Sequence, residues 1–267
     1  MSASHRPLPA PGVLSTGAAA WFMAATFGQM AFVAFILVFF GSALMDGDPG
    51  LLNDKPHITG YVPGDVLGNA QFIGHALLGG LVTFAGAWQL VPALRRKWPA
   101  AHRWNGRLFL VVALVVTLSG FYLTWVRGSR LGPGSTLSIT ANGLLILCFA
   151  ILAWRSALRR DFVGHRRHAL RAYLLVNGVW FLRIGMMLAG VLLTPLGITL
   201  DYSGATFITV SFASWVLPLA VLELYLRAGR SRHPGLHYAA AGVLGVCTLG
   251  TLGGSLAALA FMWWPLM

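Results

Sequence analysis

Charged side chains are scarce in this sequence, and acidic ones are the scarcest. Asp, Glu, Lys and Arg make up 10% of the 267 residues, against about 25% in an ordinary soluble domain. Hydrophobic residues make up 57% of the chain. So little polar surface cannot cover a domain that folds in water, and so apolar a chain is not disordered. The composition excludes both classes and indicates a protein whose solvent is the lipid bilayer.

Cysteine is nearly absent as well. Cys148 and Cys247 are the only two, and both lie in apolar segments. Two isolated thiols exclude a disulfide framework, and we expect both to act as small hydrophobic side chains. No cysteine pair and no His-Glu-x-x-His motif occurs, so we expect no zinc site.

Basic residues outnumber acidic ones, 19 to 7, which gives a formal net charge of +12. A strongly basic chain can bind nucleic acid through an accessible basic face. Here the positive residues lie between apolar segments rather than on a soluble module. We therefore expect no nucleic-acid partner, and we interpret the charge as a determinant of membrane orientation.

Seven apolar runs are long enough to cross a bilayer, which takes roughly 20 apolar residues. They are continuous rather than alternating, which favours helices over barrel strands. We predict an all-α protein, a polytopic transmembrane bundle of seven helices in one domain over 17–264, after a disordered cytoplasmic leader over 1–16. The predicted spans are 18–44, 67–93, 107–126, 137–158, 170–194, 205–226 and 238–262.

The loops between these runs differ sharply in charge. Fifteen of the 19 basic residues fall on one side, in the segments 95–107, 155–171 and 227–232 and at Arg6. The other side has three, Lys55, Arg127 and Arg130. The positive-inside rule then predicts a multi-pass protein of the cytoplasmic (inner) membrane, with its N-terminus in the cytoplasm and its C-terminus outside.

Two spans carry polar residues that should avoid lipid. In the second, small and polar residues that include Gln71 and His75 recur at steps of three and four, so they share one face. In the fifth, Arg183 lies mid-span, where an unpartnered arginine costs roughly 2.5–3.5 kcal/mol. We expect His75 and Arg183 at similar depth in the outer half. With Gln71, Trp180 and Tyr173 they form our predicted interior ligand-binding site.

Glu223 is the one acidic residue inside a predicted span. It precedes Arg227 by four residues, a spacing that favours an ion pair on the surface of one helix. The alternative is that Glu223 turns inward, toward the arginines between the fourth and fifth helices.

Two short basic segments resemble the signatures of a known family. His102-Arg103-Trp104-Asn105-Gly106-Arg107 is similar to the His-Arg-x-x-Gly-Arg signature of a bacterial family of multi-pass membrane proteins of unknown function. His165-Arg166, followed by Arg171-Ala172-Tyr173, resembles its second signature, His-Arg-x-Trp-Met-x-Arg-Ser-Tyr. His75 and Arg183 also fit its pattern, and the resemblance covers roughly 67–190.

The sequence departs from the second signature at three positions. His168 and Ala169 stand where the family usually has Trp and Met, and Ala172 stands for Ser. These departures make His168 a poor candidate for a role shared by the family. The resemblance implies an integral membrane protein of bacteria and supplies no activity.

Two functions from different classes stay open. The first is binding or transport of a small or lipid-like anion, because guanidinium groups match phosphate and carboxylate bidentately. The second is a redox protein with a b-type haem or a quinone, in which His102 and His165 would be the axial ligands. No nucleophile elbow and no paired intramembrane carboxylates occur, and catalytic residues are not predicted. The cytoplasmic-side motif comprises His102, Arg103, Gly106, Arg107, His165, Arg166 and Arg171.

Overall fold

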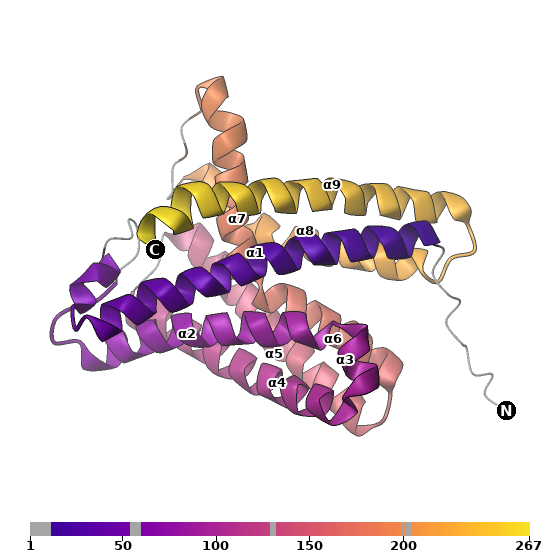
Figure 1. Cartoon of the computed structure of the whole chain (residues 1–267), viewed down its shortest axis with the longest axis horizontal. Coiled ribbons are helices and arrows are strands. Elements are labelled where there is room, and N and C mark those ends of the chain that lie inside the picture. Colours follow the sequence, from indigo (N-terminus) through magenta and orange to yellow (C-terminus); the bar gives the residue numbers. More distant parts are fainter. Residues whose placement is uncertain (1–11, 54–59, 129–131, 199, 201–203) are drawn as a thin grey trace.

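The computed structural model describes residues 12–53, 60–128, 132–198, 200 and 204–267. Over these residues the chain is helical, without β-strands, and seven of its helices are long and apolar enough to cross a membrane. The prediction of an all-α bundle with seven membrane-spanning helices is confirmed. Figure 1 shows most of them running side by side along the long axis of the molecule.

The helices are joined by short elements. The long ones are α1 (Gly12–Met45), α2 (Val66–Gln89), α4 (Pro99–Phe121), α5 (Pro133–Leu158), α7 (Gly178–Leu193), α8 (Ala205–Ala228) and α9 (Pro234–Ala258). The short ones are η1 (Pro49–Asn53), α3 (Pro92–Lys97) and α6 (Phe162–Val176). The ends of three long helices are extended by η2 (Tyr122–Val126), η3 (Thr194–Leu196), η4 (Leu259–Trp263) and η5 (Trp264–Leu266).

Local sequence explains where several helices begin. The side chain of Asp65 accepts the backbone N–H of Gly68 at 2.8 Å and caps α2, and Asp161 caps α6 in the same way. Helices α3, α4, α5 and α9 each start with a proline, whose fixed φ and missing N–H suit the first turn. Helix α1 begins at Gly12, so residues 12–16 are helical rather than part of the expected leader, whose remainder lies outside the described residues.

The fifth predicted span, 170–194, is interrupted in the structure. Helix α6 ends at Val176 and α7 begins at Gly178, so the segment over 170–176 belongs to α6 and the spanning helix starts later. The cause is Asn177, whose side-chain Nδ2 donates to the carbonyl of Tyr173 at 2.8 Å, closer than its own backbone N–H at 3.3 Å. This competition between side chain and backbone ends the helical ladder.

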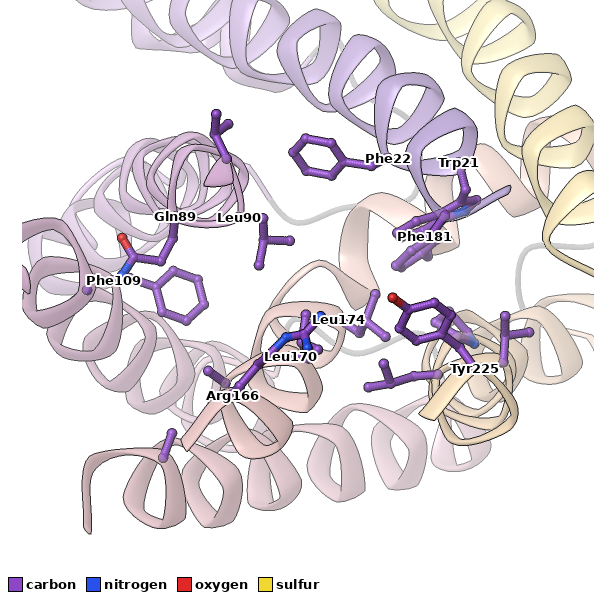
Figure 2. Close-up of a pocket in the computed structure, with 18 of the residues that line it drawn as sticks. Trp21, Phe22, Gln89, Leu90, Phe109, Arg166, Leu170, Leu174, Phe181 and Tyr225 are labelled. Atoms are coloured by element: carbon purple, nitrogen blue, oxygen red, sulfur yellow. The ribbon is translucent and has the colours of Figure 1, made fainter. Parts of the chain in front are cut away.

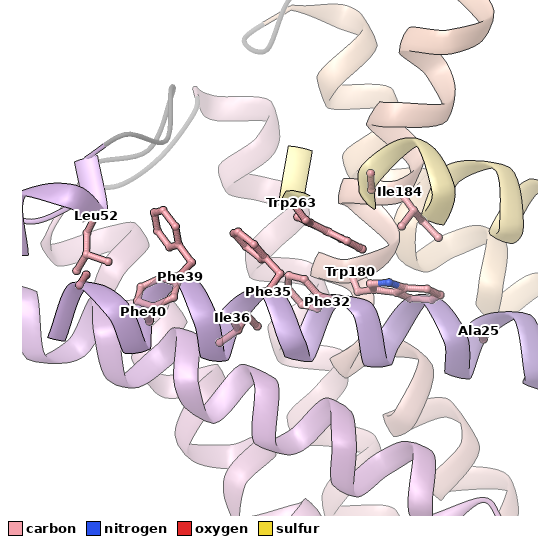
Figure 3. Packing of buried hydrophobic residues seen from close by; sticks show 12 residues of the cluster. Ala25, Phe32, Phe35, Ile36, Phe39, Phe40, Leu52, Trp180, Ile184 and Trp263 are labelled. Carbon is pink, nitrogen blue, oxygen red and sulfur yellow. The ribbon is translucent and has the colours of Figure 1, made fainter. Parts of the chain in front are cut away.

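An aromatic core holds α1 against α7 and the end of α9 (Figure 3). The ring of Trp263 lies 5.4 Å from that of Phe32 and 6.2 Å from that of Phe35, measured between centroids. Trp180 of α7 is fully buried in the same cluster. Gly254 packs α9 on α7, because a Cβ there would lie 2.6 Å from the carbonyl oxygen of Ile184.

The two ends of the bundle differ in charge. Helix α3, the α5–α6 turn and the α8–α9 turn lie at one end, toward the right in Figure 1, and carry the basic clusters. We call this the basic end. The opposite end holds η1 and the C-terminus, and Arg127 bonds Asp65 at the start of α2 there. Lys55 and Arg130, the other two basic residues expected there, lie outside the described residues.

Candidate functional site

A cavity of about 1230 Å³ opens within the bundle at the basic end (Figure 2). The charged and polar residues at this end of the cavity come from both basic motifs, from α3 and from the end of α2: Gln89, Arg95, His102, Arg103, Arg107, His165 and Arg166. The remaining wall is mostly apolar and aromatic: Figure 2 shows Trp21 and Phe22 of α1 opposite Leu170 and Leu174 of α6, with Phe181 and Tyr225 at one side. No described Asp or Glu lines it.

Hydrogen bonds from the first basic motif join the start of α4 to the end of α2. The amide nitrogen of Gln89 donates to the carbonyl of His102 at 3.0 Å and lies 3.4 Å from the Nε2 atom of its ring. Asn105, one turn along α4, donates to Gln89 Oε1 at 2.8 Å. Gly106 makes room for this contact, since a Cβ there would lie 2.7 Å from Gln89 Nε2. His102, Asn105 and Gly106 of the motif therefore all contact the side chain of Gln89.

The arginines of the motif take no part in these contacts with Gln89. Arg103 and Arg107 are exposed and line the cavity mouth. The guanidinium of Arg107 stacks 4.7 Å above the ring of Trp104, which holds a cation against an aromatic face. Neither arginine has an ion-pair partner among the described residues, so their charges are available to a ligand.

The second motif places His165 on the opposite wall. Its Nδ1–H donates to the carbonyl of Ala153 in α5 at 2.9 Å, which fixes the orientation of the ring. His102 and His165 interact electrostatically across the site. Arg166 follows directly and lines the cavity beside Leu170 (Figure 2).

Arg171, the last arginine of the motif, does not line the cavity. It forms an ion pair with Glu223 of α8, with a distance of 2.6 Å between Nη2 and Oε1. The favoured interpretation of a surface pair between Glu223 and Arg227 is therefore wrong, and the inward alternative is the one observed. The packing of α6 against α8 brings Arg171 to the carboxylate, which spacing along one helix cannot reveal.

The predicted interior site lies away from the cavity. The charge of Arg183 acts on the His75 ring, so the two residues lie within electrostatic range. The Arg183 Nη1 donates to the carbonyl of Val179 at 3.1 Å, and its guanidinium lies 5.1 Å from the Phe32 ring centre. His75 itself packs beside Gly120 of α4.

Of the other three members of that predicted site, Gln71 and Trp180 lie one turn from His75 and Arg183 respectively, and Tyr173 lies apart. Gln71 accepts a bond from Ser119 through its backbone carbonyl, and Trp180 is buried in the aromatic core. Tyr173 donates to Gln29 at 2.9 Å and packs on Gly86. Gly86 is eleven residues along α2 from His75, or about 16 Å. The structure thus separates Tyr173 from the region of His75 and Arg183, and none of the five residues lines the cavity.

A second polar cluster, not predicted from the sequence, closes the opposite end. Arg127 bonds Asp65 Oδ2 at 2.9 Å, the carbonyl of Gly60 at 2.9 Å and Asn69 Oδ1 at 2.8 Å. The backbone N–H of Gly68, reinforced by Arg127, holds the pKa of Asp65 below its ordinary value. A net charge count could not reveal this cluster, because its contacts join residues about 60 positions apart.

Several residues that line the cavity could not be assigned to it from the sequence. From the sequence, Arg95 indicates membrane orientation alone, and Gln89 is one more polar position of the second predicted span without an indicated partner. The facing residues of α8 and α9 that line the cavity had no signal beyond apolar composition.

A helical bundle with seven apolar spans, few charges and basic loops at one end is a multi-pass integral membrane protein. The family described as "Predicted membrane protein (DUF2306)" matches residues 72–226, more than half of the chain. The chain therefore belongs to this family, whose function is unknown, and the match bears out the resemblance noted in its sequence. No curated protein and no solved structure matches the chain.

Proposed function

We propose that the protein binds a lipid-like anion in the cavity at the basic end. The observation that carries this proposal is the division of the cavity wall. Four arginines, Arg95, Arg103, Arg107 and Arg166, stand at one part of it, and apolar side chains form most of the rest. A ligand with an acidic head group and a hydrocarbon body matches both parts at once.

Charge supports an anion rather than a cation. No described carboxylate lines the cavity, and these four arginines have no described ion-pair partners. Guanidinium groups hold carboxylate and phosphate oxygens in charge-assisted, often bidentate hydrogen bonds. The volume of about 1230 Å³ exceeds the roughly 300–1,000 Å³ of sites for drug-sized ligands, which favours a ligand with a long apolar part.

The orientation of the protein in the membrane determines which leaflet the ligand would occupy. The positive-inside rule favours an inner-membrane protein with the basic end in the cytoplasm. The acidic head would then lie at the depth of the cytoplasmic head groups, where basic residues attract anionic lipids.

The alternative, a b-type haem between His102 and His165, is favoured by the placement of both rings on one cavity. The fit is poor, however. Axial ligation needs a free imidazole nitrogen from each ring. The Nε2 of His102 lies 3.4 Å from the amide nitrogen of Gln89, which leaves this ring only Nδ1 for an axial bond. We therefore prefer the anion. An absorption spectrum of the purified protein separates the two, since bound haem gives a Soret band.

The test is a binding titration in phosphatidylcholine nanodiscs. Hexadecyl phosphate supplies the acidic head and long chain, and hexadecyl trimethylammonium supplies the same chain with the opposite charge. We expect the phosphate to bind and to raise the thermal unfolding temperature, because a ligand of the folded state stabilises it. The ammonium compound should do neither. Equal effects of the two compounds would refute the proposal.

Two adjacent pairs of arginines provide matched controls. Arg95 and Arg166 line the cavity, whereas their neighbours Arg96 and Arg167 do not. Arg95→Gln and Arg166→Gln should each weaken hexadecyl phosphate binding about tenfold, the loss of about 1.4 kcal/mol expected for one charge-assisted contact. Arg96→Gln and Arg167→Gln should leave it within about twofold, because neither side chain lines the cavity.

A further inference from the structure

We propose that the hydrocarbon chain of the anion lies in a groove between α8 and α9. The groove is continuous with the arginine-lined part of the cavity and open to the bilayer. This inference rests on the proposed function and adds the route of the chain. The groove is bordered by facing residues of three helices, among them Ile184 and Leu188 of α7, Ala213 and Leu217 of α8, and Cys247 and Thr251 of α9.

The pattern of these residues shows that whole helix faces border the space. On α9, Leu244, Cys247 and Thr251 recur at steps of three and four, which is one face of a helix. On α8, Val210, Ser214 and Leu217 recur in the same way. Both stripes line the cavity, so the cavity extends along both helices.

The groove has one closed end and one open end. At Gly254, α9 lies directly on the backbone of Ile184 in α7, which closes the groove just beyond Thr251. In the other direction Leu222 and Tyr225 lead into the part of the cavity lined by Leu170 and Arg166 (Figure 2). A chain in the groove therefore has one exit toward the arginines, where its acidic head would bind.

The length of the groove suits the chain of one membrane leaflet. From Val210 to Leu222, α8 rises about 18 Å at roughly 1.5 Å per residue. One leaflet contributes about half of a hydrocarbon core of about 30 Å, or about 15 Å. A head at the basic end and a chain pointing toward the bilayer centre is also the orientation of a lipid in that leaflet.

Leu217 and Pro218 identify the side on which the chain enters. Leu217 lines the groove and is also 60% exposed, so the groove opens there to the surroundings of the bundle. Pro218 lies inside α8 and lacks a backbone N–H, so the carbonyl of Ser214 loses its usual helical partner. Helix α8 can bend at this point. The ligand can thus pass sideways from the bilayer without leaving an apolar environment.

Photochemical crosslinking tests this route directly. The probe is a hexadecyl phosphate with a diazirine near the end of its chain, bound to the full-length protein in phosphatidylcholine nanodiscs and irradiated. We expect adducts on the groove residues of α8 and α9, such as Leu217 and Thr251, and at least fivefold fewer in the presence of excess unlabelled hexadecyl phosphate. A hexadecyl trimethylammonium probe with the same diazirine reports labelling from bulk lipid, and its adducts should not respond to the competitor.

A groove-filling variant provides a second readout. Ala213 lines the groove, whereas Ala220, also on α8, is exposed and does not. Ala213→Phe should weaken hexadecyl phosphate binding about tenfold and leave butyl phosphate binding unchanged, because the short chain does not reach the groove. Ala220→Phe should change neither.

The outcomes separate this inference from the proposed function. If hexadecyl phosphate binds in an Arg166-dependent manner but its adducts fall outside α8 and α9, the chain takes another route and the inference is wrong. Competitor-insensitive adducts on lipid-facing positions such as Val246 and Leu249 would contradict it equally. If hexadecyl phosphate does not bind, the proposed function fails and the inference fails with it.

Discussion

The side-chain amide of Gln89 lies between the carbonyl and the ring of His102, at 3.0 and 3.4 Å, and joins the end of α2 to the start of α4. This contact explains part of the first basic motif in physical terms. His102 and Asn105 hold the amide, and Gly106 leaves room for it. Arg103 and Arg107, which lie between and after these residues, line the cavity and do not contact Gln89.

Gly254 should be intolerant of even a methyl group. A Cβ at this position would lie 2.6 Å from the backbone oxygen of Ile184, which cannot move aside as a flexible side chain can. We expect Gly254→Ala to cost about 1–3 kcal/mol, as overpacking of a tight contact does, and to lower the unfolding temperature in detergent. Gly242→Ala is the control, since nothing lies within 4 Å of a Cβ there. Equal unfolding temperatures for the two variants would show that α7 and α9 are not in close contact.

Glu223→Gln should destabilise the packing of α6 on α8. The carboxylate bonds Arg171 at 2.6 Å, and the Arg171 and Glu223 side chains are 17% and 36% exposed. Surface pairs are worth about 0–1 kcal/mol, and breaking a buried pair costs about 3–5 kcal/mol. We expect a loss of about 1–2 kcal/mol, measured by thermal or denaturant unfolding. Arg227→Gln, at the other candidate partner, should have little effect. The reverse ranking would restore the surface pair as the correct interpretation.

Stability should fall in acid because of the cluster at the opposite end. The pKa of Asp65 is lowered by the Gly68 N–H and by Arg127, so the folded state binds this proton less readily than the unfolded state does. The resulting stability is fully present above the ordinary aspartate pKa of about 4 and is lost as the pH falls through the lowered value. Unfolding temperatures measured from pH 7 down to pH 3 should therefore decline more for the native chain than for Asp65→Asn. An identical decline would mean that Asp65 makes no such contribution. Asp46→Asn, at an exposed acid of the same end, should behave as the native chain does.

The number and placement of the spanning helices were predictable because a bilayer sets a minimum apolar length. The break at Asn177 was not, since it depends on a side chain competing for the Tyr173 carbonyl. The two basic motifs could be found from the sequence, but their separate contributions could not. Arg166 lines the cavity, and Arg171, five residues later, pairs with Glu223 because α6 crosses α8 there.

The predicted site around His75 and Arg183 shows the same division. Their similar depth followed from helical rise alone, and the electrostatic interaction between them is consistent with it. Tyr173 was grouped with them because it lies on the same predicted helix. The break at Asn177 and the bond to Gln29 give it different surroundings. Ligand binding in the region of His75 stays a prediction.

In the function we propose, the cavity at the basic end holds an acidic amphiphile. The most direct test is native mass spectrometry of the protein purified in mild detergent from the membranes in which it is expressed, with and without Arg166→Gln. We predict a bound mass that dissociates as a long-chain carboxylate or phosphate, present on the native chain and on Arg167→Gln and depleted on Arg166→Gln. A bound mass of equal occupancy in all three proteins, or a neutral or cationic one, would contradict it.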